Sequence, residues 1–386
     1  LLIGGATTSR AHTAIKIAPN SEGAVVYVPD ASRAVGVATR LLSTEQKAGY
    51  VAEVAAEYEA MRAEHAGRKG ATLVSLADAR ANRFTSNEAY TPVRPARPGR
   101  EEITIPLADL VPCIDWSPFF QSWDLAGRYP AILDNETVGE TARQLFADAQ
   151  AMLAKIVAEN WLTAKAVFGL YPAKGENEDI VLYADDSRSS EAARWVGLRQ
   201  QIKQPQGRCN TALADFVGEQ DYAGAFAVTA GLGIDDRVAA FEAAHDDYSA
   251  IMLKALADRL AEAAAEWLHQ KVRTYYWGYA VGESLDNDAL IAESYTGIRP
   301  APGYPACPDH TAKRELFALL DAPAIGMGLT ESCAMTPAAA VSGFYIGHPA
   351  AKYFAIPKIG RDQLEDWARR KGMDIREAER WLAPLL

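Results

Sequence analysis

The sequence predicts an α+β domain of mixed helices and antiparallel sheet, preceded by the βαβα end of a doubly wound α/β domain. Two observations support this prediction. Near the N-terminus, two short apolar segments each lead through a turn into a helix-forming segment. Beyond residue 100, strand candidates and helical segments no longer alternate strictly, which favours α+β over α/β. A length of 386 residues suggests two or three domains.

The first 65 residues carry the βαβα pattern. Residues 1–3 are predicted as a strand end, Gly4–Gly5 as a tight turn and residues 9–17 as a helix. A second strand at 24–28 precedes another helix. Parallel sheets bind ligands beyond the carboxyl ends of their strands, where the glycine pair would lie, although close helix–strand packing explains such a pair more often. Because the chain lacks an initiator Met and starts as a buried strand, we expect it to be part of a longer protein.

A charged helical segment at 44–68 and a proline-bearing stretch at 90–102 lead into the second domain. Its main helical region is predicted at 235–277. The residues expected to form the buried stripe of that region are Leu253, Leu256, Leu260 and Trp267. The strand candidates are 166–173, 179–185, 224–231, 342–348 and 352–358.

Acidic residues stand out in two places. Asp258, Glu262 and Glu266 recur every four residues on one face of the long helical region, a pattern typical of a solvated face. Asp115 lies in the aromatic-rich segment 113–123, where a carboxylate can be buried only if it has partners. Core packing with one satisfied Asp is the alternative to a ligand contact there.

Composition limits the classes of partner. The formal net charge of −11 argues against a nucleic acid or an anionic membrane surface. Four cysteines without a C-x-x-C pair argue against a zinc cluster and a disulfide scaffold, and favour a reducing, cytoplasmic location. No apolar run reaches the roughly 18 residues that a membrane span needs.

Common catalytic motifs are missing from the sequence. It holds no G-x-S-x-G, no H-E-x-x-H and no Walker loop, and its six histidines are scattered. The GLG at 231–233 lacks the third glycine of a dinucleotide-binding loop. We therefore predict no catalytic acid, base or nucleophile and no metal ligand in this chain.

The segment 297–310, GIRPAPGYPACPDH, has unusual chemistry. Its four prolines exclude a helix and a central strand, which leaves a stiff irregular ribbon with bare carbonyls. Arg299 offers a planar fork to a carboxylate, acidic residues suit an ammonium, and ring faces and carbonyls suit a cation that cannot donate hydrogen bonds. An amino acid that carries a sulfonium would use all three, as would other zwitterions. A stiff surface connector is the simpler alternative.

Several long strings occur in an order that resembles the carboxyl-terminal part of the cobalamin-dependent methionine synthase family. They are IGGATTSRAHTA, VPDASRAVG, IDWSPFFQSWDLAGRYP, AHDDY, RPAPGYPACPDHT and the closing HPAAKYFAI through RRKGM and ERWLAP. The resemblance implies that residues 1–65 are the end of the cobalamin-binding domain with a helical linker. It implies that residues 66–386 are a C-shaped activation domain that binds S-adenosylmethionine.

In that family the activation domain supports reductive methylation of oxidised cob(II)alamin, with electrons from a flavodoxin-type donor. The resemblance assigns the carboxylate of S-adenosylmethionine to Arg299. Further contacts with the same ligand are implied at Asp115, Glu262, Glu293, Ala301, Gly303, Tyr304, Tyr353 and Phe354. The family commonly carries Tyr at the position of Phe354, so a hydroxyl contact is lost there.

The resemblance also implies cobalamin contacts at Gly4, Gly5, Ser9 and Thr13. The family's axial histidine, in an Asp-x-His-x-x-Gly loop, is absent from this sequence, as are the folate domain and the zinc-containing homocysteine domain. We therefore expect a reactivation module that does not complete methionine synthesis alone, with the cobalamin domain of the same enzyme as its partner.

Two alternatives remain from the sequence. The first is a platform that docks a redox protein and holds no small ligand of its own; its basic face would come from Arg94, Arg97, Arg100, Arg369, Arg370 and Lys371. The second is an autonomous methyltransferase, which the missing glycine-rich loop disfavours.

Overall fold

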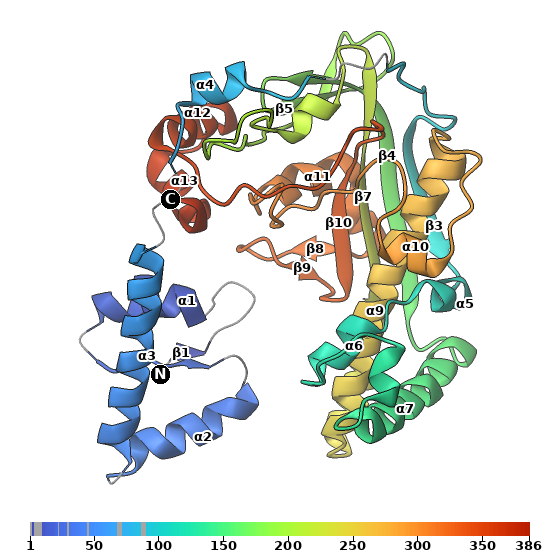
Figure 1. The fold of residues 1–386 in the computed structure, drawn as a ribbon. Helices are drawn as coiled ribbons and strands as arrows, with labels where there is room; N and C mark the ends of the chain where they lie inside the picture. The colour runs from blue at the N-terminus through green and yellow to red at the C-terminus, as the bar shows by residue number, and fades with distance from the viewer. Residues whose placement is uncertain are drawn as a thin grey trace. The chain divides into compact units, whose positions relative to one another are not determined.

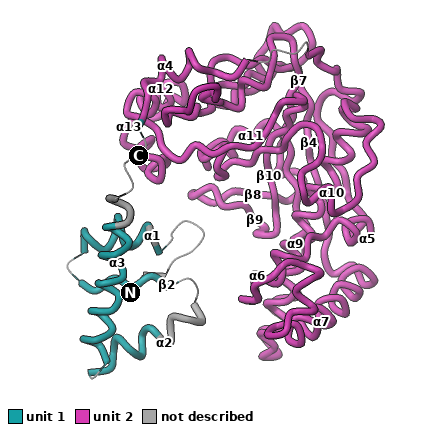
Figure 2. The backbone as a smooth tube through the Cα atoms, in the orientation of Figure 1, with its two compact units in different colours: residues 1–72 teal, residues 73–386 magenta. Residues whose placement is uncertain are grey.

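The computed structural model describes residues 2–3, 10–21, 23–28, 31–44, 46–67, 72–85 and 90–386. The chain divides into two compact units, Leu1–Thr72 and Leu73–Leu386, which Figure 2 colours separately. The predicted domain boundary after residue 65 lies inside helix α3 (Lys47–Gly67), shortly before the division between the units.

Unit 1 is built around a two-stranded parallel sheet, as expected for the end of a doubly wound domain. Strand β1 (Leu2–Ile3) pairs with β2 (Tyr27–Val28) in parallel. The Tyr27 N–H donates to the hydroxyl of Tyr58 on α3 over 2.9 Å, and Tyr58 belongs to the small buried core of this unit. The other elements are α1 (Arg10–His12), the π-helical turn η1 (Thr13–Ile17), the 3-10 turn η2 (Ala18–Asn20) and α2 (Ala31–Leu42).

Unit 2 contains an antiparallel sheet in the order β10-β7-β4-β5-β6, with β3 paired to β4. All of its strand pairs are antiparallel, in agreement with the predicted α+β class. The strands are β3 (Gly99–Ile105), β4 (Thr163–Glu176), β5 (Asp179–Tyr183), β6 (Glu191–Trp195), β7 (Asp221–Leu232) and β10 (Ala340–Tyr345). A separate pair is formed by β8 (Gly328–Leu329) and β9 (Met335–Thr336).

Side chains of the central strands alternate between two hydrophobic clusters, one on each face of the sheet. Phe168 and Phe226 lie in the cluster that includes helix α9 (Asp247–Lys271). Val167 and Ala227, one position away, lie in the cluster that includes α11 (Ala312–Leu320). This is the period of two that a strand imposes, and it places α9 and α11 on opposite faces.

The remaining helices of unit 2 extend from this sheet. Figure 1 shows α9 running along the sheet and on to α6 and α7, and Figure 2 shows that unit 2 by itself forms an open arc between α12 and α7. The helices are α4 (Leu76–Ala81), α5 (Leu107–Leu110), α6 (Ser117–Ser122), α7 (Gly139–Ala158), α8 (Ile234–Ala243), α10 (Asn287–Ile291), α12 (Arg361–Lys371) and α13 (Ile375–Trp381). The short turns are η3 (Val111–Cys113), η4 (Ala131–Asp134), η5 (Leu213–Phe216), η6 (Val272–Tyr276), η7 (Ala322–Ile325) and η8 (Ala383–Leu385).

Four of the five predicted strands overlap β4, β5, β7 and β10. The prediction of a strand at 352–358 is wrong. That segment lies beside the proline-rich ribbon, and the Ile356 N–H donates to the Pro305 carbonyl over 2.8 Å. Because the prolines lack N–H donors, the ribbon cannot supply the rest of a ladder.

The predicted helix at 235–277 is interrupted between α8 and α9, where His245 adopts a positive φ of 56°. Leu253, Leu256 and Leu260 are fully buried, as predicted, but Trp267 is partly exposed. Leu268 takes the buried position instead. Among the described residues, no helix is both long and apolar enough to cross a membrane.

Candidate ligand-binding site

The ribbon 297–310 lies along the edge of the main sheet beside β10. Ile298 pairs with Ile346, and the Pro300 carbonyl accepts the Phe344 N–H over 2.9 Å. Gly297 has a φ of +81°, and a Cβ there would lie 2.6 Å from the Ile346 carbonyl oxygen. Glycine therefore permits the close approach with which the ribbon begins.

Beyond Pro300 the ribbon folds back on itself. The Tyr304 N–H donates to the Ala301 carbonyl over 3.2 Å, and the Gly303 N–H donates to the Cys307 carbonyl over 2.7 Å. Gly303 has a φ of +94°, and a Cβ added there would lie 2.3 Å from the His310 ring. These contacts hold the turn that carries Tyr304.

A pocket of about 320 Å³ opens between this ribbon, α9 and the sheet. This volume falls within the range typical of small-molecule sites. Seven of the nine predicted S-adenosylmethionine contacts line it: Glu262, Glu293, Arg299, Ala301, Tyr304, Tyr353 and Phe354. The other lining residues are Phe226, Pro300, Pro305, Ala306 and Val341.

Asp115 and Gly303 are not among the lining residues. Asp115 precedes α6, and its carboxylate accepts the Ser117 N–H over 2.9 Å. Gly303 lies within the ribbon turn, next to Tyr304. A direct contact of either residue with a ligand remains a prediction.

The side-chain hydrogen bonds and the ion pair of Arg299 within the described residues all involve one nitrogen, Nη1. Its Nη1 lies 2.7 Å from Oε2 of Glu266, 3.1 Å from Nδ1 of His269 and 3.2 Å from the Tyr295 hydroxyl. Its Nε and Nη2 have no hydrogen-bond partner within the described part of the chain. Burial lowers the pKa of an arginine, but the Glu266 carboxylate raises the pKa of Arg299, so the guanidinium stays charged. Two nitrogens of the guanidinium, which carry three N–H donors, are therefore available to a ligand.

The face of α9 behind Arg299 was missed by the sequence analysis. Glu266, interpreted there as part of a solvated face, is buried and paired with Arg299, so that interpretation is wrong for this residue. His269 is fully buried next to it. The spacing of Glu262, Glu266, His269 and Arg273, at intervals of four, three and four, is the pattern that places them on one helical face.

Two carboxylates line the pocket on its more exposed side. Glu262 is exposed on α9, and Glu293 is an exposed residue with a positive φ of 54° just after α10. Partial desolvation of the Glu293 carboxyl raises its pKa, Arg299 lowers it and Glu266 raises it, with a net upward shift. These two groups make the pocket suitable for a cationic centre.

Aromatic residues lie at the rim of the pocket. The Tyr353 hydroxyl accepts the backbone N–H of Arg299 over 3.0 Å, and the side chain remains 37% exposed. Tyr304 is 61% exposed, and Phe354 is partly buried against the hydrophobic clusters below. Their rings give faces on which a flat or cationic group can stack.

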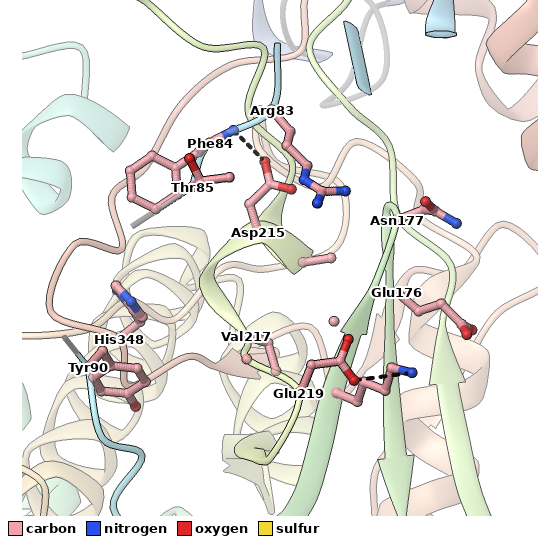
Figure 3. A pocket seen from close by; sticks show the side chains of 14 residues that line it. Arg83, Phe84, Thr85, Tyr90, Glu176, Asn177, Asp215, Val217, Glu219 and His348 are labelled. Carbon is pink, nitrogen blue, oxygen red and sulfur yellow. Dashed lines mark hydrogen bonds and ion pairs between the residues drawn. The ribbon is translucent and has the colours of Figure 1, made fainter. Parts of the chain in front are cut away.

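A larger pocket of about 550 Å³, shown in Figure 3, contains none of the predicted site residues. Several of its charges are already paired: Lys174 lies 3.4 Å from Glu219, and Asp215 accepts the Phe84 N–H over 3.3 Å and pairs with Arg199. We therefore take the Arg299 pocket as the candidate site.

The predicted cobalamin contacts at Gly4, Gly5 and Ser9 lie outside the described residues. Thr13 is fully buried in η1, and its contact with a corrin remains a prediction. Over the described ranges, no group of three or more His, Cys, Asp or Glu side chains could hold a metal ion.

The basic residues proposed as a docking face are engaged in ion pairs or hydrogen bonds. Arg94 pairs with Asp186 over 2.7 Å, Arg100 with Glu102 over 2.6 Å, and Lys371 with Glu315 over 2.8 Å. The others are Arg97 with Glu101, Arg369 with Asp366, and Arg370 with Asp366 and Asp179. They give little support for a free basic patch.

Two comparisons with known proteins bear on this pocket. Residues 106–372 match the family model described as "Vitamin B12 dependent methionine synthase, activation domain", a range that includes every residue lining the pocket. A solved structure, "Crystal Structure of the MetH Reactivation Domain bound to AdoHcy", is 52% identical in sequence. It superposes with a TM-score of 0.79 over 81% of this chain and 98% of that chain.

Proposed function

Because this chain belongs to the family of vitamin B12-dependent methionine synthase activation domains, we propose that its Arg299 pocket binds S-adenosylmethionine for the reductive reactivation of oxidised cobalamin. The resemblance predicted from the sequence is confirmed by both comparisons. AdoHcy, the ligand of the solved relative, is S-adenosylmethionine without the transferable methyl group, which supports this choice of ligand.

The observation that carries the proposal is that only one of the three guanidinium nitrogens of Arg299 is engaged by neighbouring side chains of the described residues. Its Nη1 is held by Glu266, His269 and Tyr295, while Nε and Nη2 remain for the ligand carboxylate. The carboxylates of Glu262 and Glu293 lie in the same pocket and suit the sulfonium and the ammonium of the ligand. The rings of Tyr304, Tyr353 and Phe354 complete a set of groups that a sulfonium amino acid can use.

Methyl transfer from a sulfonium requires little acid–base catalysis from the protein. When bound, the corrin supplies the nucleophilic cobalt, and the sulfonium is already a good leaving group. The residues of this chain would bind the amino-acid end, orient the methyl group and limit the access of water. Cys307 is buried, and this burial raises the pKa of its thiol, which supports a structural role over a nucleophilic one.

We place the chain within a cobalamin-dependent methyltransferase. Residues 1–65 would form the end of the cobalamin-binding domain, residues 66–386 the activation domain, and a flavodoxin-type donor would supply the electrons. We expect residues 1–386 on their own to bind S-adenosylmethionine without completing the methionine synthase cycle. The alternative, a docking platform with no small ligand of its own, is disfavoured by the pocket and by the paired basic residues.

Calorimetric titration with S-adenosylmethionine tests the proposal. We expect Arg299→Ala to weaken binding by about 2 kcal/mol, or roughly thirtyfold, because a charge-assisted bond to the carboxylate is lost. Glu242→Gln is the control, since Glu242 lies exposed on α8 and pairs with Lys254 over 3.4 Å. Equal affinity of the wild type and Arg299→Ala would refute the site, and no heat of binding in the wild type would favour the docking platform.

A further inference from the structure

Behind Arg299 lies a layer of buried polar atoms. Of the twelve buried side-chain atoms without a hydrogen-bond partner in the described residues, five belong to this layer. They are Oε1 of Glu266, Nε2 of His269, Nη1 of Arg273 and the hydroxyls of Tyr279 and Tyr345. A buried polar atom without a hydrogen bond costs about 1–3 kcal/mol. Ion pairing at 3.8 Å offsets part of this cost for Oε1 of Glu266 and Nη1 of Arg273, but the other three atoms still need an explanation other than stability.

Four of these residues, Glu266, His269, Arg273 and Tyr345, contact one another directly or through the Tyr295 ring. The His269 ring stacks on Tyr345 at 5.2 Å between centroids and meets Tyr295 edge-on at 4.8 Å. Arg273 lies over the Tyr295 ring at 4.3 Å and has its Nη1 3.8 Å from Oε1 of Glu266. Arg273 is balanced by Glu283 over 2.7 Å, which leaves Glu266 to pair closely with Arg299.

The protonation of His269 is set by these surroundings. Burial, Arg299 and Arg273 all lower the pKa of its imidazole, so the ring is neutral. A neutral ring that accepts from Arg299 at Nδ1 carries its proton on Nε2. The imidazole therefore acts as a fixed acceptor against Nη1 and adds no positive charge beside the guanidinium.

We propose that Glu266 and His269 are positioning residues, which hold Nη1 of Arg299 so that Nε and Nη2 face the pocket and select a ligand with a carboxylate. This rests on the proposed function, in which Arg299 receives the carboxylate of S-adenosylmethionine. An unrestrained arginine side chain loses rotamer freedom on binding, and holding it in place beforehand removes part of that cost. Both residues act through Arg299 and need not touch the ligand.

The test compares S-adenosylmethionine with decarboxylated S-adenosylmethionine, which keeps the adenosine, the sulfonium and the amine but lacks the carboxylate. Both are titrated calorimetrically into the full chain, into Glu266→Gln, His269→Ala and Arg299→Ala, and into the two double variants with Arg299→Ala. We expect Glu266→Gln and His269→Ala each to weaken S-adenosylmethionine roughly tenfold. Their effect on the decarboxylated ligand, and in the Arg299→Ala background, should be within about twofold.

His269→Asn places a carbonyl acceptor near the position of Nδ1 and should restore most of the affinity lost in His269→Ala. If thermal melting shows that His269→Ala does not fold, His269→Asn replaces it in the comparison of the two ligands. Equal weakening of both ligands by Glu266→Gln, or further weakening in the Arg299→Ala background, would overturn the positioning role. If Arg299→Ala itself leaves S-adenosylmethionine binding unchanged, the proposed binding site fails first, which separates the two failures.

Discussion

Nη1 of Arg299 and Oε2 of Glu266 lie 2.7 Å apart at a largely buried position of the pocket, where the Glu266 side chain is 10% exposed. Desolvation of such a pair offsets much of its Coulomb energy, so its main effect is on orientation. Because Glu266 already balances the charge of Arg299, the carboxylates of Glu262 and Glu293 remain to attract a positive ligand. The pocket should therefore discriminate between ligands by the charge on sulfur.

We expect Glu262→Gln and Glu293→Gln to weaken S-adenosylmethionine more than S-adenosylhomocysteine. In our proposal each carboxylate attracts the sulfonium of S-adenosylmethionine, whereas the thioether of S-adenosylhomocysteine carries no charge. Since both side chains are exposed, the loss should be about 1 kcal/mol, or roughly fivefold, for S-adenosylmethionine. Parallel titrations with the two ligands measure this difference, with Glu242→Gln as the matched control. Equal losses for both ligands would show that neither carboxylate senses the sulfur charge.

Binding of S-adenosylmethionine should strengthen as the pH rises from 4.5 toward neutrality. Partial desolvation at the pocket raises the pKa of Glu293 above its ordinary 4.5, so a fraction of this carboxyl is protonated at mildly acidic pH. The cationic ligand favours the ionised form, so binding releases a proton and gains affinity as the pH passes through the raised pKa. Titrations at several pH values, in buffers of different ionisation enthalpy, measure the release. Glu293→Gln should flatten the profile, and an unchanged profile in that variant would assign the titration to another group.

The sequence and its family resemblance supplied much of the pocket but not the layer behind it. Arg299, Ala301 and Tyr304 belong to one stiff segment whose proline pattern is visible in the sequence. Glu266 and His269 are functional in our proposal because α9 packs against Tyr345 and Arg299, which lie far away in the chain. The spacing of Glu266 and His269 shows that they share one face of α9. Only the packed structure shows that this face contacts Tyr345 and Arg299.

The same reasoning explains why residues 352–358 do not form the strand predicted from the sequence. Its residues have suitable β propensity, but a strand needs a neighbour with free N–H and C=O groups. The neighbour here is the proline-rich ribbon, and the Ile356 N–H finds an acceptor at Pro305 without a continued ladder. The β propensity of one segment gives no information about the backbone N–H donors of the segment beside it.

Gly303→Ala should destabilise the ribbon and weaken ligand binding together. The new Cβ would lie 2.3 Å from the His310 ring, whose Nδ1 is 3.0 Å from Nζ of Lys313, and a φ of +94° is unfavourable for alanine. We expect a loss of about 2–4 kcal/mol in the free energy of unfolding, measured by urea denaturation. Gly207→Ala is the matched control, because Gly207 has a φ of +81° with nothing within 4 Å of the added Cβ. That variant should lose only about 1 kcal/mol and keep wild-type affinity, and equal losses at both glycines would exclude the clash with His310.

Glu178→Gln should destabilise unit 2 through a buried ion-pair network that is separate from the ligand pocket. Arg199 is fully buried and lies 2.8 Å from Glu178 and 2.7 Å from Asp215, so removing the Glu178 charge leaves a buried guanidinium undercompensated. The expected loss is about 3 kcal/mol in urea denaturation at neutral pH.

The network should also make the chain sensitive to acid. Burial raises the pKa of Glu178, but hydrogen bonds from Arg80 and Arg199 outweigh it and hold the pKa below its ordinary 4.5. A carboxyl with a lowered folded pKa contributes stability above its unfolded pKa, and this contribution is lost as the pH falls through the folded value. The difference in the free energy of unfolding between the wild type and Glu178→Gln should therefore be constant above about pH 5 and shrink below 4.5.

Glu219→Gln is the control for this pH dependence. It removes a largely exposed partner of Lys174 and should change the free energy of unfolding by less than about 0.5 kcal/mol at every pH. A gap between the wild type and Glu178→Gln that widens on acidification would show that the carboxyl is protonated in the folded state, contrary to this assignment.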